Sequence, residues 1–118
     1  MILADTSVWI DHLRHGNASL ARSLQDAMVV THPFVIGELA CGNIRMRQQV
    51  LSLLSRLPTV APVSHNEALH FLESRSLSGK GLGWVEVHLI AAAVAARIPL
   101  FTLDRRLAAV HLSVAKPV

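Results

Sequence analysis

"MILADTSVWI", residues 1–10, changes its pattern at Asp5. The residues before Asp5 are apolar, and a short apolar run of this kind predicts a buried strand that begins with the first residue. After Asp5, Thr6 or Ser7 can cap a helix whose apolar face begins at Val8. The stretch therefore predicts a strand, an acidic residue and a helix in direct succession.

The same alternation of short apolar runs and helical patterns continues along the chain. Further strands are expected over 28–32, 58–63 and 99–103, with a short last one over 111–114. Helices are expected over 17–27, from Pro33 to about Gly42, around Val50–Leu57, after the capping motif Ser64–Glu67 and over 84–97, with a flexible connection over 76–83. Strand–helix alternation predicts an α/β fold of three layers (α/β/α) around a central, mostly parallel sheet. In such sheets the site lies beyond the C-terminal ends of the strands.

Length and composition limit the class of protein. A chain of 118 residues with 52% hydrophobic residues is expected to form one domain over 1–118. No apolar run is long enough to span a bilayer, and the start lacks the basic and apolar segments of a secretory signal. The single cysteine, Cys41, is expected to be a small buried residue and fits a reducing cytoplasm. The net charge of +3 permits an anionic partner such as nucleic acid.

Four of the eight acidic residues stand among apolar neighbours and are expected to point inward: Asp5, Glu38, Glu86 and Asp104. Two of these, Asp5 and Asp104, directly follow predicted strands. The remaining four are expected on solvated faces, at helix ends or in a cap: Asp11, Asp26, Glu67 and Glu73. Four inward carboxylates cannot all ionise side by side without a cation. Oxygen-only ligands favour Mg²⁺ or Mn²⁺.

Glu86 by itself supports two interpretations. It can be a carboxylate of the metal site, or it can reach solvent from the first turn of a helix, where a negative charge is favourable in any case. The sequence alone leaves both open for this residue.

Four segments, in their order and spacing, resemble the PIN-domain ribonucleases of the VapC toxin family. They are "ILADTSVWID" (2–11), "HPFVIGELACG" (32–42), "GKGLGWVEVHLIAAA" (79–93) and "LFTLDRRL" (100–107). The resemblance implies a compact α/β fold, an acidic cluster that binds Mg²⁺ or Mn²⁺, and metal-dependent cleavage of RNA. It also implies a cognate VapB-type antitoxin that blocks the site, a toxin homodimer and a toxin–antitoxin hetero-oligomer.

The family's acidic positions fall on Asp5, Glu38, Glu86 and Asp104, which are the expected catalytic and metal-binding residues. The third position is usually Asp, so Glu86 carries one methylene more. Some members have another acid shortly after the fourth position, where this chain has Arg105–Leu107. The number of metal ions therefore stays open.

Small polar and basic residues near the acidic motifs each allow two interpretations of their role. Ser7 and Thr102 are candidates to support the metal site by hydrogen bonding, or they are a helix cap and a strand hydroxyl. Five basic residues are candidates to hold the RNA backbone, or they carry ordinary surface charge: Arg45, Arg47, Lys80, Arg105 and Arg106.

Two other functions are compatible with an acidic α/β domain. A catalytically weakened PIN-like module would bind RNA or protein without cleaving, and Glu86 in place of Asp keeps this alternative open. A receiver-like signalling domain would need an Asp after a middle strand, and "PTVAPVSHN" (58–66) offers none. Metal-dependent RNA cleavage that one carboxylate substitution abolishes would separate the enzyme from both.

Overall fold

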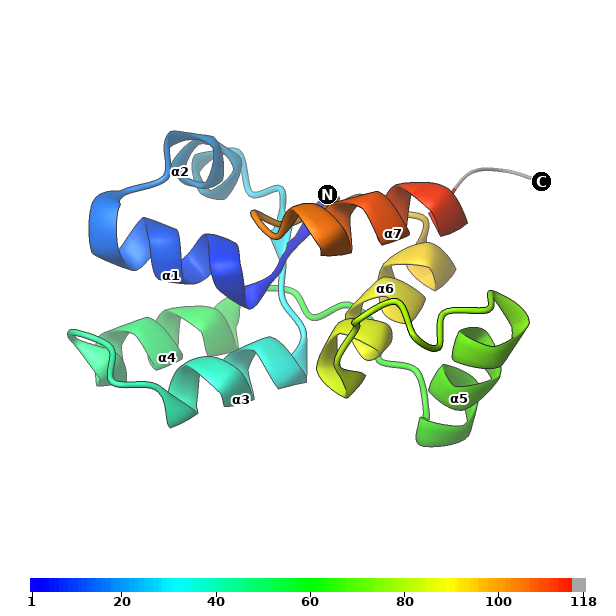
Figure 1. Ribbon diagram of the computed structural model, residues 1–118. Helices are drawn as coiled ribbons and strands as arrows, with labels where there is room; N and C mark the ends of the chain where they lie inside the picture. Colours follow the sequence, from blue (N-terminus) through cyan, green and yellow to red (C-terminus); the bar gives the residue numbers. More distant parts are fainter. Residues whose placement is uncertain (116–118) are drawn as a thin grey trace.

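The computed structural model describes residues 1–115, which form three short strands and seven helices (Figure 1). The strands are β1 (Ile2–Ala4), β2 (Val29–Val30) and β3 (Leu100–Phe101). The helices are α1 (Thr6–His15), α2 (Ala18–Gln25), α3 (Pro33–Cys41), α4 (Arg47–Arg56), α5 (His65–Ser74), α6 (Trp84–Ala96) and α7 (Arg105–Ala115). No helix within residues 1–115 is long and apolar enough to cross a membrane.

The strands form one parallel sheet in the order β2-β1-β3. Leu3 of β1 is in register with Val30 on one side and with Leu100 on the other, so the first strand is the central one. Helix α2 packs against β2, while α6 and α7 pack against β3. The α/β fold and the parallel sheet expected from the sequence are confirmed.

Helix α6 is buried on all sides along most of its length. Its residues from Val87 to Ala93 are all buried, because α5, α7 and β3 all pack against this helix. A helix that is apolar all round belongs in the interior of a domain. The more polar start of α6 is therefore the part that reaches the surface.

Two of the expected strands do not form within residues 1–115. Residues 111–114 are not a strand but the end of α7, where Leu107, His111 and Val114 are buried at helical spacing. Residues 58–63 do not form a strand; Thr59 alone makes an isolated parallel bridge, and the prolines of this segment cannot donate to a ladder.

The cap of α1 and the single cysteine also differ from expectation. Asp5, rather than Thr6 or Ser7, caps α1. Cys41, at the end of α3, is exposed. The expected capping box of Ser64 and Glu67 at the start of α5 is confirmed.

Candidate active site

Two of the four candidate acids follow the strands β1 and β3 and begin helices. The Asp5 carboxylate oxygen Oδ1 accepts a hydrogen bond from the Val8 N–H of α1, at 3.3 Å. The Asp104 oxygen Oδ1 accepts from the N–H groups of Arg106 and Leu107 of α7, at 2.9 and 3.2 Å. A helix N-terminus favours a negative charge, so the fold keeps both carboxylates at the edge of the sheet.

The other two acids come from helices. Glu38 lies on α3, and its Oε1 accepts a hydrogen bond from the Thr6 hydroxyl at 2.6 Å. Glu86 lies in the first turn of α6, and its Oε1 accepts from the Gly83 N–H at 2.8 Å. Within residues 1–115, the second carboxylate oxygen of each of these glutamates has no hydrogen-bond partner.

Apolar flanks predicted that all four acids point inward, and this holds only for Asp5. Its side chain is buried, Glu86 and Asp104 are half-buried, and Glu38 is exposed. On α3, Val35 and Leu39 occupy the buried face, and Glu38 lies beside that face. The flanking residues are apolar because they enter the core, whereas the acids lie where the core meets the surface.

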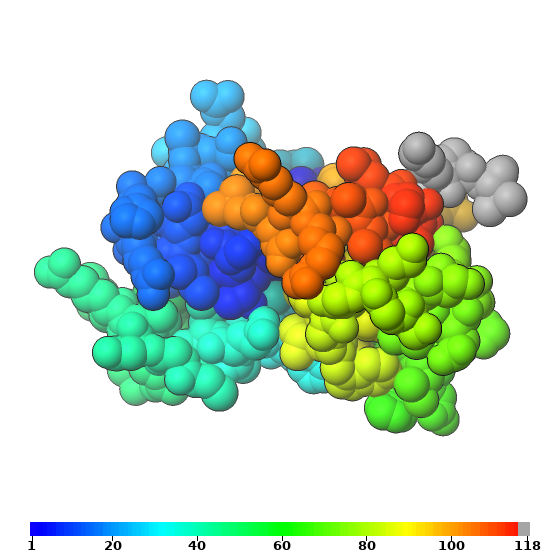
Figure 2. Space-filling model, viewed as in Figure 1, coloured from blue at the N-terminus to red at the C-terminus, as the bar shows by residue number. Residues whose placement is uncertain are grey.

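All four acids line one pocket of about 370 Å³. The remaining lining residues come from the start of α1 and the start of α6: Thr6, Ser7, Gly83, Trp84, Val85 and Leu89. Figure 2 shows the surfaces of α1, α3, α6 and α7 meeting on one face of the molecule. Segments separated by most of the chain thus place their carboxylates around a single hollow.

Two hydroxyl groups hold the Asp5 carboxylate in position. Ser7 Oγ donates to Oδ1 at 2.5 Å, and Thr102 Oγ1 donates to Oδ2 at 2.6 Å. Both hydroxyls also accept from backbone N–H groups that follow β3, Ser7 from Leu103 and Thr102 from Asp104, each at 3.0 Å. The polar network therefore fixes the two strand ends relative to each other as well as orienting Asp5.

The donor atoms around the pocket suit a hard divalent cation. In the described part of the chain, no three His, Cys, Asp or Glu side chains stand close enough to hold one ion together. Mg²⁺ usually binds proteins through one or two carboxylates and keeps several waters. The pocket fits such an ion if one or two acids touch it and the others reach it through water.

Comparison with known proteins identifies the family. Residues 2–111 match the PIN domain. Ribonuclease VapC32 of Mycobacterium tuberculosis, strain CDC 1551 / Oshkosh, is 46% identical over 110 residues, which cover 92% of this chain and 89% of the relative. The same protein of strain ATCC 25618 / H37Rv gives the same values. This chain belongs to the VapC family of PIN-domain ribonucleases.

Membership confirms the expectation of a PIN-domain endoribonuclease that acts as the toxin of a toxin–antitoxin pair. VapC nucleases generally depend on a divalent metal, and VapC toxins generally bind RNA and a VapB antitoxin. The receiver-like alternative is wrong, because the match to the PIN domain covers almost the whole chain.

Arg106 is the basic candidate that this PIN domain brings to the acids. Its guanidinium lies 3.7 Å from Asp104 Oδ2. It also lies against Gly81, where a Cβ would stand 2.7 Å from Arg106 Nη1 and where φ is +79°. The positive φ favours glycine at this position, whereas the flexible end of the Arg106 side chain could move away from a Cβ. Arg47 instead donates to the Ala40 carbonyl on α3.

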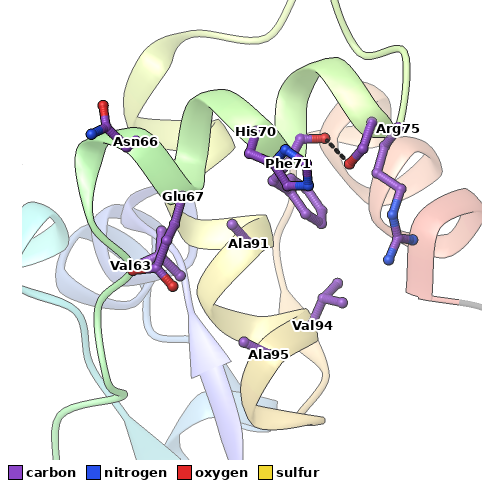
Figure 3. A pocket seen from close by; sticks show the side chains of 10 residues that line it. Val63, Asn66, Glu67, His70, Phe71, Arg75, Ala91, Val94 and Ala95 are labelled. Carbon is purple, nitrogen blue, oxygen red and sulfur yellow. Dashed lines mark hydrogen bonds between the residues drawn. The ribbon is translucent and has the colours of Figure 1, made fainter.

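A second groove of this VapC-family chain lies between α5 and α6 (Figure 3). It measures about 530 Å³, and Phe71, Ala91 and Val94 are among its apolar lining residues. It contains none of the four candidate acids. Because the acid pocket contains the start of α6 and this groove lies farther along the helix, the two hollows are distinct.

Sequence reasoning missed the contribution of Trp84 to the acid pocket. It also missed that Asp5 and Asp104 each cap the helix that follows. The signal for the caps was present, since Asp is a preferred N-cap residue and both aspartates stand between a strand and a helical pattern. The signal for Trp84 was a large aromatic residue two positions before a candidate acid.

Proposed function

We propose that this chain, acting as a single PIN domain over 1–118, cleaves RNA at the acid pocket with Mg²⁺ or Mn²⁺ as cofactor. Asp5, Glu38, Glu86 and Asp104 are the proposed catalytic and metal-binding residues. The observation that supports this assignment is their meeting around one pocket, at the ends of parallel strands, from four separate elements. Ligand sites of open α/β sheets lie at this edge.

Each acid has a role that follows from its contacts. Asp5 is held at both oxygens by hydroxyl donors, so it offers a fixed negative charge. Glu38 and Glu86 each have one oxygen free of protein partners within the described residues, so they can bind a cation or orient water. A divalent ion in such a site activates water, neutralises phosphate charge and stabilises the leaving oxygen.

The decisive experiment is Asp5→Asn. Asn is as good an N-cap as Asp and keeps an oxygen that accepts from Val8, so the fold is expected to stay intact. Removing the charge should abolish metal-dependent cleavage of RNA. The matched control is Asp26→Asn at the end of α2, which should cleave like wild type.

Cleavage is measured on purified chain with total RNA, with Mg²⁺ and Mn²⁺ titrated separately, and folding is checked by urea denaturation. Full activity of Asp5→Asn, or undiminished wild-type activity in excess chelator, would falsify the metal mechanism. A higher maximal rate with one ion identifies the preferred cofactor.

We further propose that a VapB-type antitoxin covers the acid pocket and an adjoining groove. This groove lies between α1 and the α3–α4 connection, measures about 510 Å³ and has Ile10, Leu13 and Ile44 among its apolar lining. Glu38 lines both hollows, so one extended segment can occupy them together. An antitoxin Arg beside Glu38 or Asp104 would match a carboxylate with a planar fork.

Growth measurements test this partner. Expression of the chain alone should arrest growth, and co-expression of the small protein encoded beside it should relieve the arrest. Leu13→Glu should remove the relief while the purified variant still cleaves RNA, because Leu13 lines only the adjoining groove. Unchanged relief with Leu13→Glu would show that this groove does not hold the antitoxin.

We also propose that the chain forms a homodimer and a toxin–antitoxin hetero-oligomer and that it is located in the cytoplasm. The exposed thiol of Cys41 supports a reducing compartment, where such a thiol stays reduced. The family resemblance supports the homodimer. Sedimentation equilibrium of the purified chain, with and without antitoxin, measures both assemblies.

A further inference from the structure

Two aromatic side chains stand at the edge of the acid pocket. Phe34 lies at the start of α3 and Trp84 is the first residue of α6. Phe34 is 39% and Trp84 is 37% exposed, although both are large apolar residues. Both pack on the buried imidazole of His88, with ring centroids 4.8 and 4.7 Å away. The two rings are therefore held in place from below and open to solvent.

These rings line a shallow hollow that runs into the acid pocket. The hollow is lined by Pro33, Phe34, Gly37, Glu38, Cys41, Trp84 and Val85. Three of these residues, Glu38, Trp84 and Val85, also line the acid pocket. An occupant of the acid pocket therefore continues directly onto the aromatic surface.

The chemistry of the two neighbouring surfaces points to a nucleotide. Four carboxylates repel the phosphates of RNA until a cation is present, so binding near them gains from contacts that do not depend on charge. Stacking of a base on an aromatic ring is such a contact, and every base has a face that can stack.

We propose that Trp84, together with Phe34, forms a stacking site for the base of a nucleotide adjacent to the scissile phosphate. This inference rests on the proposed RNA cleavage at the acid pocket and adds a specific substrate contact to it. The aromatic site binds the base, and the acid pocket acts on the neighbouring phosphodiester. The ligand is unpaired RNA, because a base within a duplex has no free face to offer.

The chain carries its own probe for this contact. It contains two tryptophans, of which Trp9 is only 1% exposed. A change in tryptophan emission on adding RNA therefore reports on Trp84. The chain is titrated with a short single-stranded RNA in excess chelator, so that binding is seen without cleavage. Quenching of the emission is expected, and an RNA with abasic sites throughout should bind more weakly and leave the emission unchanged.

Substitutions then measure the energy of the contact. Trp84→Leu keeps an apolar side chain against His88 but removes the stacking ring, and it should weaken RNA binding about 5- to 150-fold. Phe34→Leu should weaken binding in the same direction, while Trp84→Phe should retain most of it. Phe71→Leu, in the groove between α5 and α6, is the matched aromatic control and should bind RNA like wild type.

The outcomes separate this inference from the proposed function. One outcome is that Trp84→Leu binds RNA as tightly as wild type, while wild type cleaves RNA and Asp5→Asn does not. This outcome overturns the stacking site and leaves the acid pocket intact. A second outcome is that RNA quenches the wild-type emission and Trp84→Leu binds RNA more weakly, while Asp5→Asn cleaves fully. This outcome supports the stacking site and overturns the acid mechanism. Emission that shifts with protein concentration but not with RNA would mean that a second copy covers the rings, which also overturns the stacking site.

Discussion

The starts of α5 and α6 share one local structure and differ in their surroundings. In α5 the Ser64 N–H donates to Glu67 Oε1 at 2.9 Å, and in α6 the Gly83 N–H donates to Glu86 Oε1 at 2.8 Å. Both glutamates occupy the third helical position and satisfy a backbone N–H that has no partner within its helix. The first residues of the two helices, His65 and Trp84, contact each other at 5.1 Å between ring centroids.

The differences separate a structural carboxylate from a candidate catalytic one. At α5 the Ser64 hydroxyl also accepts from the Glu67 N–H at 3.1 Å, which completes the capping box. These backbone and side-chain hydrogen bonds to Ser64 lower the pKa of Glu67. At α6 glycine has no side chain to complete the box, and Glu86 faces three other acids. A glutamate at this position is therefore explained by helix capping alone, and only the acids from distant segments indicate catalysis.

The largest expected effect separates the two glutamates by activity. Glu86→Gln should lower metal-dependent RNA cleavage on the order of 100-fold, because a site that binds a cation loses one of its charges. Glu67→Gln, the matched substitution at the start of α5, should cleave like wild type. Both are measured as initial rates at limiting Mg²⁺ and Mn²⁺. Equal rates for the two variants would mean that Glu86 is a capping residue only.

Glu86→Asp is the control for chain length. The resemblance to the VapC family implies Asp at this position, so this variant should remain active. Loss of activity in Glu86→Asp to the level of Glu86→Gln would show that this pocket is built around the longer side chain.

A third helix start extends the comparison from carboxylate to imidazole. His32 caps α3 by accepting the Phe34 N–H at Nδ1, at 2.9 Å. Burial, together with the nearby His88, lowers the pKa of His32 from 6.5 to about 4. Because the pKa of His32 is lower in the folded than in the unfolded state, the contribution of neutral His32 to stability is fully present above pH 6.5. This contribution falls as the pH drops towards 4. Acidification from pH 6.5 to 5 should lower the free energy of unfolding by about 1.5 kcal/mol.

Urea denaturation across this pH range measures the effect, and His32→Asn is its control. Asn keeps a side-chain acceptor for the Phe34 N–H but does not titrate. Its overall stability should be lower because the ring leaves a cavity, yet its stability should depend less on pH. An unchanged pH slope in His32→Asn would assign the dependence to other histidines.

Ser64→Ala tests the half of the capping box that α6 lacks. Removing the hydroxyl should destabilise the chain by about 1 kcal/mol, because the Glu67 N–H loses its acceptor. Cleavage at saturating metal should not change. A loss of activity without a loss of stability would mean that the start of α5 takes part in the reaction.

The smallest effect is expected from completing the capping box at the start of α6. Gly83 has φ −81° and ψ 166°, a conformation open to any residue, and a Cβ there would lie 3.6 Å from Glu86 Oε1. Gly83→Ser should therefore fit and raise the free energy of unfolding by a few tenths of a kcal/mol. The shift in the urea midpoint measures this. A destabilised Gly83→Ser would show that the start of α6 cannot adopt the arrangement seen in α5.

Elements with strong local signals were predictable from the sequence. The strand at 1–4 and the helix at 84–97 have apolar runs whose lengths suit one type of element, and the Ser64–Glu67 motif marks a helix start by its own hydrogen bonds. The four acids were found by their apolar neighbours, and their meeting around one pocket follows from the parallel sheet.

Features that depend on contacts between distant segments were not predictable. The segment 111–114 alternates polar and apolar residues as a half-buried strand does, and only packing against the rest of the core makes it the end of α7. The exposure of Glu38 depends on which face of α3 meets α1 and α4, and single-sequence patterns do not fix this. The hollow formed by Phe34 and Trp84 joins residues whose rings meet through His88, and no local pattern predicts that this histidine lies between them.

The central position of β1 has a consequence for the order in which contacts form during folding. Its pairing with β3 brings together strands that enclose six helices between them in the chain, and the Thr102 hydroxyl that holds Asp5 lies 97 residues away. Contacts between residues so far apart in the chain carry a high cost in loop-closure entropy, so they form slowly. We therefore expect the pocket that contains Asp5 and Asp104 to assemble late in folding, after the local contacts within the helices.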